Sequence, residues 1–144
     1  MKIIDTNVLL YVVNRLAPHH GAITQWWTAA TNDGEPLGFT WVTLLGFVRM
    51  ATNPRVFARP LSVRQAVDQV SEWLALPTAR IVQESPDHWK VLAQLLATVG
   101  TAGNLTTDAH LAALALHHGA TLVSCDADFL KFRQVRFENP ISAS

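Results

Sequence analysis

The sequence has little cysteine, little charge and no excess of either charge sign. Cys125 is the single cysteine in 144 residues, so the chain cannot form an internal disulfide, and we expect a reducing compartment. Basic and acidic residues number eleven each, so the basic excess typical of nucleic-acid-binding domains is absent. Any contact with RNA or DNA must therefore use local basic patches. Charged residues make up only 15% of the chain. So few charges leave apolar surface exposed on a small domain, which predicts self-association or a protein partner.

Long hydrophobic runs are also missing. No apolar segment approaches the roughly 20 residues needed to span a bilayer, and the start of the chain lacks the basic and apolar layout of a signal peptide. We therefore expect a cytoplasmic protein that does not enter a membrane. Residues 1–144 are predicted to form one domain, because this length suits a single sizeable core. The six histidines show no zinc-binding spacing with a carboxylate or thiol partner.

Short β-rich runs alternate with helical stretches along the chain. Ser62 is a plausible N-cap for a helix over 63–74, whose apolar residues recur at helical spacing. The stretch 108–118 is apolar nearly all round, which predicts a central helix capped by Thr106 or Thr107 and ended by Gly119. Strands that alternate with helices predict an α/β fold with a mostly parallel sheet of four to five strands, covered on both faces. The expected strands are 2–5, 37–39, 79–82, 122–124 and 135–137.

Acidic residues follow two of the apolar runs and open one helix. Asp5 ends the first expected strand, Asp108 begins a helix, and Asp126 and Asp128 follow the fourth strand. Ligands of open α/β sheets collect at the carboxyl ends of the strands, so these acids are predicted to converge. Converging carboxylates repel one another unless a hard cation joins them, which predicts a Mg²⁺ or Mn²⁺ site that acts on phosphates. The alternative is a simple helix-start role, as an N-cap or a partner of the helix dipole.

Four segments, in this order, carry a resemblance to a known family. The chain resembles PIN domains, and more narrowly the VapC toxins, which are the ribonuclease half of bacterial type II toxin–antitoxin (VapBC) pairs. Asp-Thr-Asn alone would be a weak signal, but the four segments together extend from one end of the fold to the other. They are Ile-Ile-Asp-Thr-Asn at 3–7, Phe-Val-Arg-Met-Ala-Thr-Asn-Pro at 47–54, Gly-Asn-Leu-Thr-Thr-Asp-Ala-His-Leu-Ala-Ala-Leu-Ala at 103–115 and Thr-Leu-Val-Ser-Cys-Asp-Ala-Asp-Phe at 121–129.

The resemblance implies a PIN-domain α/β/α sandwich and a metal-dependent endoribonuclease. Its substrates would be phosphodiester bonds in structured RNA, such as tRNA or rRNA loops. Asp5, Asp108 and Asp126 would be the catalytic residues and the ligands of Mg²⁺ or Mn²⁺, with Asp128 as a further candidate ligand. The resemblance also implies a homodimer and a small cognate VapB-type antitoxin that covers the active site.

Other polar residues of the matching segments are candidates for supporting roles. Thr6 and Asn7 could hydrogen-bond the pocket carboxylates or a phosphate oxygen, although turn chemistry alone would also explain them. Thr107 resembles a pocket hydroxyl of the family, and Arg49 could reach a phosphate or pair with an acid. For the candidate RNA-binding cations, an ordinary solvated surface is the alternative. These cations are Arg55, Arg59 and Lys131.

One position departs from the family's pattern. VapC toxins commonly carry a glutamate on the helix before the Arg49 segment, and the equivalent position here is Gly46. A pocket with one fewer negative charge should hold divalent cations less tightly. The alternative function is therefore a catalytically weakened PIN-like module that binds RNA. A phosphatase-like hydrolase with Asp5 as nucleophile is a further alternative, but that chemistry usually needs a carboxylate where this chain has Asn7.

Overall fold

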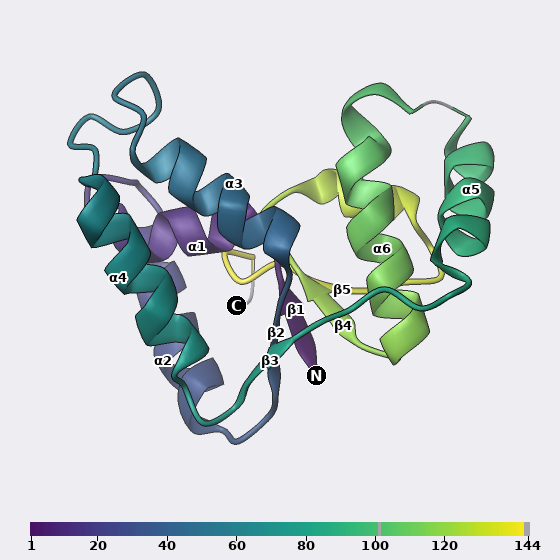
Figure 1. Ribbon diagram of the computed structural model, residues 1–144, viewed down its shortest axis with the longest axis horizontal. Helices are drawn as coiled ribbons and strands as arrows, with labels where there is room; N and C mark the ends of the chain where they lie inside the picture. The colour runs from purple at the N-terminus through teal and green to yellow at the C-terminus, as the bar shows by residue number, and fades with distance from the viewer. Residues whose placement is uncertain (101, 143–144) are drawn as a thin grey trace.

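A parallel sheet lies between two layers of helices in the computed structural model, which describes residues 1–100 and 102–142 (Figure 1). Its five strands pair in the order β3-β2-β1-β4-β5, and every pair is parallel. No helix in the described ranges is both long and apolar enough to cross a bilayer. In chain order the elements are β1 (Lys2–Ile4), α1 (Thr6–Val13), α2 (His20–Asn32), β2 (Leu37–Phe39), α3 (Trp41–Ala51), α4 (Val63–Leu74), β3 (Ala79–Ile81), α5 (His88–Val99), the 3₁₀ turn η1 (Gly103–Leu105), α6 (Thr106–His118), β4 (Thr121–Val123), the 3₁₀ turn η2 (Ala127–Lys131) and β5 (Arg136–Glu138).

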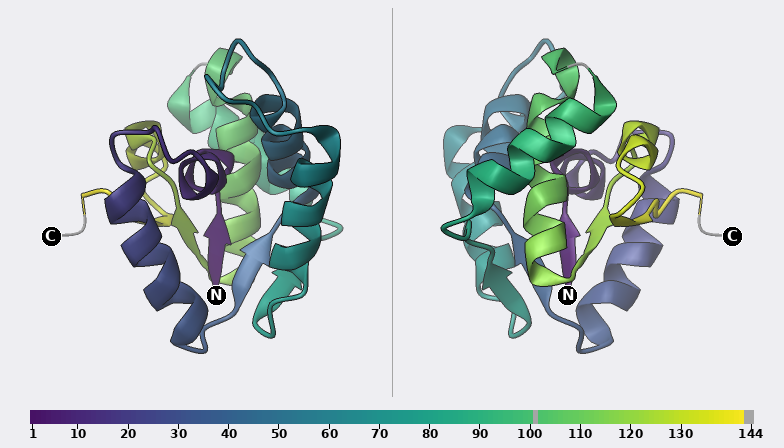
Figure 2. Two further views of the ribbon diagram at one scale, coloured as in Figure 1. Left: turned by 90° about the vertical axis from the view of Figure 1, so that its left-hand side faces the viewer. Right: turned by 90° about the vertical axis from the view of Figure 1, so that its right-hand side faces the viewer.

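The sheet divides the core into two halves. Ile3 and Leu122 lie in one half with side chains of α5, α6 and η2. Ile4 and Val123 lie in the other half with side chains of α1 to α4, because consecutive residues of a strand point to opposite faces. Figure 2 shows the two helical layers from either side. The predicted α/β/α sandwich is therefore confirmed, and its sheet is parallel throughout.

Local signals explain how two of the helices begin and end. Ser62 caps α4 as predicted: its Oγ accepts a hydrogen bond from the Gln65 N–H at 3.1 Å. The Gln65 side chain accepts one in return from the Ser62 N–H at 2.9 Å, which completes a capping box. Gly119 ends α6 with a φ of 59°, a left-handed conformation that glycine adopts without strain.

The predicted cap of α6 is wrong. The N-cap is Leu105, and no side-chain hydrogen bond caps this helix. The reason is that η1 runs directly into α6, so Thr106 already belongs to the helix. Its hydroxyl donates to the Gly103 carbonyl at 3.0 Å instead, and Thr107 lies in the first turn.

The direction of strand addition changes between β1 and β4. The sheet grows outward from β1 through β2 to β3, and from β4 to β5 on the other side. The carboxyl ends of β1 and β4 therefore flank a crevice of the kind in which α/β proteins bind ligands. Asp5 directly follows β1 and Ser124 directly follows β4. This topology brings Asp5 and the acidic segment after β4 to one edge of the sheet, although they are far apart in the sequence.

Gly38 in the middle of β2 leaves no room for a side chain. A Cβ at this position would lie 2.7 Å from Val82 Cγ2 and 3.0 Å from Ile3 Cγ1. Gly38→Val should therefore lower the free energy of unfolding by about 1–3 kcal/mol through overpacking, as measured by urea denaturation. Gly21→Ala is the matched control, because a Cβ there meets nothing within 4 Å and should leave stability unchanged or raise it by up to about 1 kcal/mol. Equal stability of Gly38→Val and wild type would contradict this packing.

Candidate metal centre

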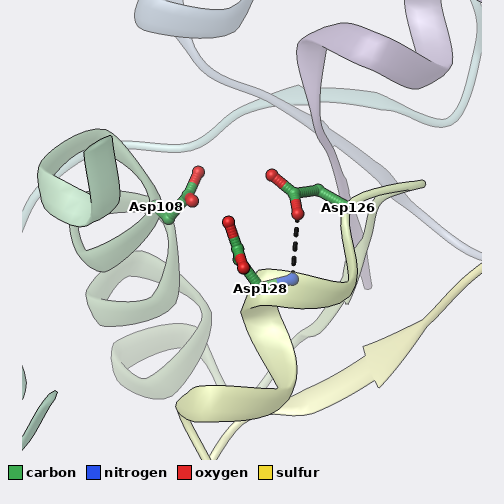
Figure 3. A group of neighbouring side chains, drawn as sticks. All are labelled: Asp108, Asp126 and Asp128. Atoms are coloured by element: carbon green, nitrogen blue, oxygen red, sulfur yellow. Dashed lines mark hydrogen bonds between the residues drawn. The ribbon is translucent and has the colours of Figure 1, made fainter.

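Three carboxylates gather where β4 ends. Asp108 comes from the first turn of α6, whereas Asp126 and Asp128 lie at the start of η2, and Figure 3 shows the three side chains directed toward a common space. One oxygen from each side chain lies within 4.8 Å of the others. Over residues 1–100 and 102–142, no other set of three or more histidine, cysteine or acidic side chains meets this spacing. Carboxylate oxygens this close can hold a hard divalent cation.

Backbone hydrogen bonding positions the two acids that follow β4. Asp126 Oδ1 accepts from the Asp128 N–H at 2.9 Å, so Asp126 is the N-cap of η2. The Asp128 carboxylate instead forms an ion pair with Lys131, at 3.3 Å between Oδ1 and Nζ. The turn thus presents both carboxylates beside α6.

Asp5 lies next to this cluster but is held by its own hydrogen bonds. Its Oδ1 accepts from the Thr6 N–H at 2.7 Å, which makes Asp5 the N-cap of α1. Its Oδ2 accepts from Ser124 Oγ at 2.7 Å. Asp5 does not belong to the group of three closely spaced acids. Its role as a metal ligand therefore stays a prediction, while its capping role is a feature of the structure.

Ser124 is the centre of the network between β1 and β4. It is fully buried, with 0% of its surface exposed. Besides donating to Asp5, its Oγ accepts from Asn7 Nδ2 at 3.1 Å and from the Asp126 N–H at 3.0 Å. A hydroxyl has one proton and two lone pairs, so these three bonds use its full capacity. Asn7 also accepts from the Cys125 N–H at 3.0 Å, which ties α1 to the segment after β4.

A pocket of about 570 Å³ opens beside Asp5. Its polar lining contains all four predicted supporting residues, and α3 contributes an apolar wall. The lining residues are Asp5, Thr6, Asn7, Leu10, Val42, Leu45, Gly46, Arg49, Met50 and Thr107.

Gly46 allows α3 to approach α1 closely in this pocket. A Cβ at position 46 would lie 3.1 Å from Thr6 Oγ1. The same Thr6 hydroxyl donates to the Thr43 carbonyl at 3.1 Å, which joins the two helices. A larger residue at position 46 would require the Thr6 side chain to shift by a few tenths of an ångström. The family's usual glutamate has no acidic replacement on α3.

Burial and the repulsion of neighbouring carboxylates raise the pKa of Asp108. The pKa of Asp108 rises to about 6, mainly because the carboxyl is partly buried and further because of the negative charges of Asp5, Asp126 and Asp128. The ammonium group of Lys131 acts in the opposite direction. A carboxylate that resists ionisation for these reasons is one that a bound cation would stabilise.

Burial is also the main cause that raises the pKa of Asp5, and the charge of Asp126 adds to it. The hydrogen bonds from Ser124 and Thr6 oppose this shift, because they stabilise the ionised carboxylate. The pKa of the neighbouring Cys125 thiol rises to about 12, first through burial and then through the charge of Asp5. Cys125 is therefore a protonated, unreactive thiol at neutral pH.

A family model described as PIN domain matches residues 2–136. The chain belongs to the PIN-domain family. Ribonuclease VapC37 of Mycobacterium tuberculosis is 48% identical to it over 140 residues, which cover 97% of each chain. Ribonuclease VapC33 of the same organism is 38% identical over 141 residues, which cover 98% of this chain and 99% of the relative. These relatives confirm the resemblance to VapC.

Two solved structures illustrate how widely this PIN fold is shared. One is the structure of VapBC2 from Rickettsia felis bound to a DNA fragment from its promoter. A chain in it matches with a TM-score of 0.69 at 16% identity, and the match covers 96% of this PIN domain and 97% of that chain. A chain of FitAcB from Neisseria gonorrhoeae matches with a TM-score of 0.67 at 22% identity, covering 99% of both. At these identities the likeness supports the fold alone.

The three predicted RNA-binding cations of this PIN domain and the supporting residue Arg49 lie at different places. Lys131 is at the carboxylate cluster through its ion pair with Asp128, and Arg49 lines the pocket. Arg59 instead lines a separate cavity of about 500 Å³ between the end of α1 and α4. Arg55 is exposed on the segment between α3 and α4. Only Lys131 and Arg49 are thus brought to the acids, and the roles of all four cations stay predictions.

Ser124 is a residue of the PIN-domain site that the sequence pattern does not predict. The pattern around it predicts only the end of a strand. A hydroxyl between an apolar strand and Asp126 is the one local signal, and it is weak because strand ends are commonly polar. The decisive contact joins Ser124 to Asp5 across 119 positions, and it follows only once β1 is known to pair with β4.

The raised pKa of Asp108 predicts a pH dependence of metal binding. Because Mg²⁺ competes with the proton for this carboxylate, affinity should fall about tenfold between about pH 7 and about pH 5, on either side of the pKa near 6. Calorimetric titration with Mg²⁺ at both pH values measures this change, and Asp108→Asn should weaken binding and reduce the change. The stability of the metal-free protein should depend on pH in the opposite direction. The folded protein holds the proton on Asp108 more tightly than the unfolded chain does. Its free energy of unfolding should rise as the pH falls through about 6. A Mg²⁺ affinity that does not vary over this interval would contradict the shift.

Proposed function

We propose that this PIN domain is the toxin of a type II toxin–antitoxin pair and cuts RNA as a metal-dependent endoribonuclease. The observation that carries the proposal is the gathering of Asp108, Asp126 and Asp128 within 4.8 Å, beside Asp5 at the carboxyl ends of β1 and β4. Relatives at up to 48% identity are named ribonucleases. Hydrolysis of a phosphodiester bond is the chemistry that this acid cluster supports best.

The donor set suits a hard cation such as Mg²⁺ or Mn²⁺. Carboxylate oxygens are the ligands that these ions prefer. Burial and then the repulsion of neighbouring acids raise the pKa of Asp108 to about 6, and a cation would relieve that repulsion. Asp108, Asp126 and Asp128 would hold the ion, with Asp5 as a further ligand, directly or through water. When bound, the cation lowers the pKa of a water molecule and offsets negative charge that develops at the phosphate.

The surrounding residues hold these carboxylates in place before substrate arrives. Ser124 connects Asp5 to the Asp126 N–H, so the ends of β1 and β4 keep a fixed separation. Asn7 reinforces this connection through the Ser124 hydroxyl and the Cys125 N–H. Groups positioned in advance need not reorganise as charge develops in the transition state, which lowers the barrier.

RNA would occupy the pocket beside Asp5. Arg49 and Thr107 line this pocket and can bind a phosphate oxygen, while Val42 and Leu45 offer an apolar surface for a base. The chain has no net charge, so affinity must come from such local contacts and from the cation. We expect a structured RNA, such as a tRNA or rRNA loop, because shape then contributes to recognition.

The proposed partner is a small VapB-type antitoxin. The solved structures with this fold include VapBC and FitAB assemblies. On α3, Trp41 and Leu45 are 56% and 65% exposed, and Leu45 also lines the pocket. An antitoxin segment on this apolar surface would block the pocket, and a homodimer would cover further apolar surface. We expect the purified pair to cut RNA more slowly than the free toxin.

Matched RNA and DNA hairpins test the proposed reaction. We expect cleavage of the RNA hairpin only, dependent on Mg²⁺ or Mn²⁺. The products should carry 5′-phosphate and 3′-hydroxyl ends, because water attacks the phosphorus and the 3′-oxygen leaves. Products with 2′,3′-cyclic phosphate ends would instead require attack by the RNA's own 2′-hydroxyl and would contradict the mechanism. Equal cleavage of both hairpins would assign a general nuclease.

A second candidate function is RNA binding without cleavage. The observation that favours it is Gly46, because α3 then contributes no acid to the pocket. A folded protein that retains RNA in EDTA and never cuts it would support this alternative. Metal-dependent cleavage by the wild-type chain would exclude it.

A further inference from the structure

Three side chains outside the metal centre converge between β3, α5 and α6. His88 begins α5, and its Nε2 lies 2.8 Å from Nδ1 of His110 on α6. The two rings are nearly perpendicular, at 82°. Nε2 of His110 lies 3.6 Å from Glu84 Oε1. α5 packs along α6 (Figure 1, Figure 2), which brings together two histidines 22 positions apart.

We propose that His88 and His110 form a binding site for a divalent transition metal of the zinc class, separate from the carboxylate cluster. Imidazole nitrogen suits Zn²⁺, Ni²⁺ and Cu²⁺, whereas Mg²⁺ prefers oxygen. The same small domain thus presents two donor sets of different chemistry. Asp108, Asp126 and Asp128 select hard cations, and the histidine pair selects softer ones.

The spacing of the two rings is close to what a shared metal ion requires. One of the two facing nitrogens must carry a proton, because the other accepts it at 2.8 Å. A Zn²⁺ ion about 2.0–2.1 Å from each nitrogen would place them roughly 3.3 Å apart in tetrahedral geometry. Replacing the proton by the ion therefore separates the nitrogens by about 0.5 Å, a change that small rotations of the two side chains provide.

Glu84 lies close enough to His110, at 3.6 Å between Oε1 and Nε2, to become the second partner that a metal-bound histidine needs. The ring nitrogen that does not bind metal commonly donates to a carboxylate, which fixes the tautomer and orients the ring. Glu84 lies beside Nε2 of His110, so Nδ1, which faces His88, is the ligand nitrogen. The side chains of His110 and Glu84 are 22% and 52% exposed. Ions can therefore enter, and water fills the remaining coordination positions.

Titration calorimetry with Zn²⁺ in the presence of excess Mg²⁺ tests this site, because Mg²⁺ competes for the carboxylate cluster and Asp126→Asn identifies any Zn²⁺ that still binds there. We expect the wild-type protein to bind one Zn²⁺ ion per chain. His88→Ala and His110→Gln should each weaken binding at least about tenfold, and Glu84→Gln about tenfold through loss of the orienting carboxylate. His117→Ala is the matched control, because it removes an exposed histidine that packs against His118 outside the proposed site. Its Zn²⁺ affinity should equal that of the wild type.

Thermal unfolding with and without Zn²⁺ gives a second readout. An ion that binds only the folded state raises the Tm, so the Tm should rise for the wild type and His117→Ala and stay constant for His88→Ala. A circular dichroism spectrum of each variant establishes that it is folded. No Zn²⁺ binding by the wild type, or equal affinity of His88→Ala, would overturn the proposal. If Asp126→Asn lost Zn²⁺ binding while the histidine variants kept it, the ion would lie at the carboxylate cluster. That result would also overturn the proposal.

Discussion

Asp126→Asn is expected to suppress RNA cleavage while making the metal-free protein more stable. The asparagine oxygen can still accept the Asp128 N–H, so the cap of η2 is kept. One negative charge is removed from a group of acids within 4.8 Å of one another. Cleavage should fall by about 10²–10³-fold, the scale for losing one electrostatic contribution to a transition state. Relief of repulsion should stabilise the metal-free fold by about 0.5–1 kcal/mol, or about 1–4 °C in Tm.

Slower cleavage combined with higher stability of the metal-free protein distinguishes a functional acid from a structural one. Thermal unfolding in EDTA and cleavage in Mg²⁺ measure them separately. Asp68→Asn is the control for charge, because the Asp68 side chain is 65% exposed and pairs only with Arg64 on the same helix; it should leave both quantities unchanged. In saturating Mg²⁺ the order of stability should reverse, since the wild type binds the cation more tightly. A variant that cuts like the wild type, or melts lower in EDTA, would refute the assignment of Asp126.

Ser124→Ala should damage both stability and activity. The fully buried hydroxyl uses all three of its hydrogen bonds, to Asp5, Asn7 and Asp126. Its removal leaves buried groups without partners, which should cost about 2–3 kcal/mol and lower the Tm by roughly 5–10 °C. The Ser124 hydrogen bond lowers the pKa of Asp5, so without it this pKa should rise further. We therefore expect the pH midpoint of metal binding to move upward, together with at least about tenfold slower cleavage at neutral pH.

The shift of that pH midpoint separates a positioning role from simple packing. Ser124→Thr keeps the hydroxyl and should restore the midpoint even if the added methyl group lowers stability. Ser71→Ala is the control for loss of a hydroxyl, because Ser71 is exposed and donates only to the Val67 carbonyl of its own helix. An unchanged midpoint in Ser124→Ala would show that Asp5 does not depend on this bond.

The fold was predictable because strand and helix periodicities alternate clearly along the chain. The predicted strands 2–5 and 122–124 come from short β-rich runs, and they lie within one residue of the observed Lys2–Ile4 and Thr121–Val123. The amphipathic stretch 63–74 follows a capping signal at Ser62. Strands separated by helices then require a parallel sheet. The predicted cap of α6 was wrong because no sequence signal separates the preceding 3₁₀ turn from the helix.

The candidate site was only partly predictable. Asp108, Asp126 and Asp128 could be expected to converge, since strand ends of one sheet share an edge. The hydrogen bond from Ser124 to Asp5 and the contact of His88 with His110 both join residues far apart in sequence. Such contacts depend on which strands and helices are neighbours and on their register, and local periodicity does not contain that information.

Cleavage of total bacterial RNA by the antitoxin-free protein is the most direct test of a metal-dependent endoribonuclease built on these acids. Wild type with Mg²⁺ or Mn²⁺ is compared with wild type in EDTA and with Asp5→Asn, and all new 5′ ends are sequenced. We predict cuts at a few defined loops in the wild type with metal, absent from both controls, which would also show that Gly46 is compatible with catalysis. Cuts that persist in EDTA or in Asp5→Asn, or a folded wild type that binds RNA without cutting it, would contradict the account.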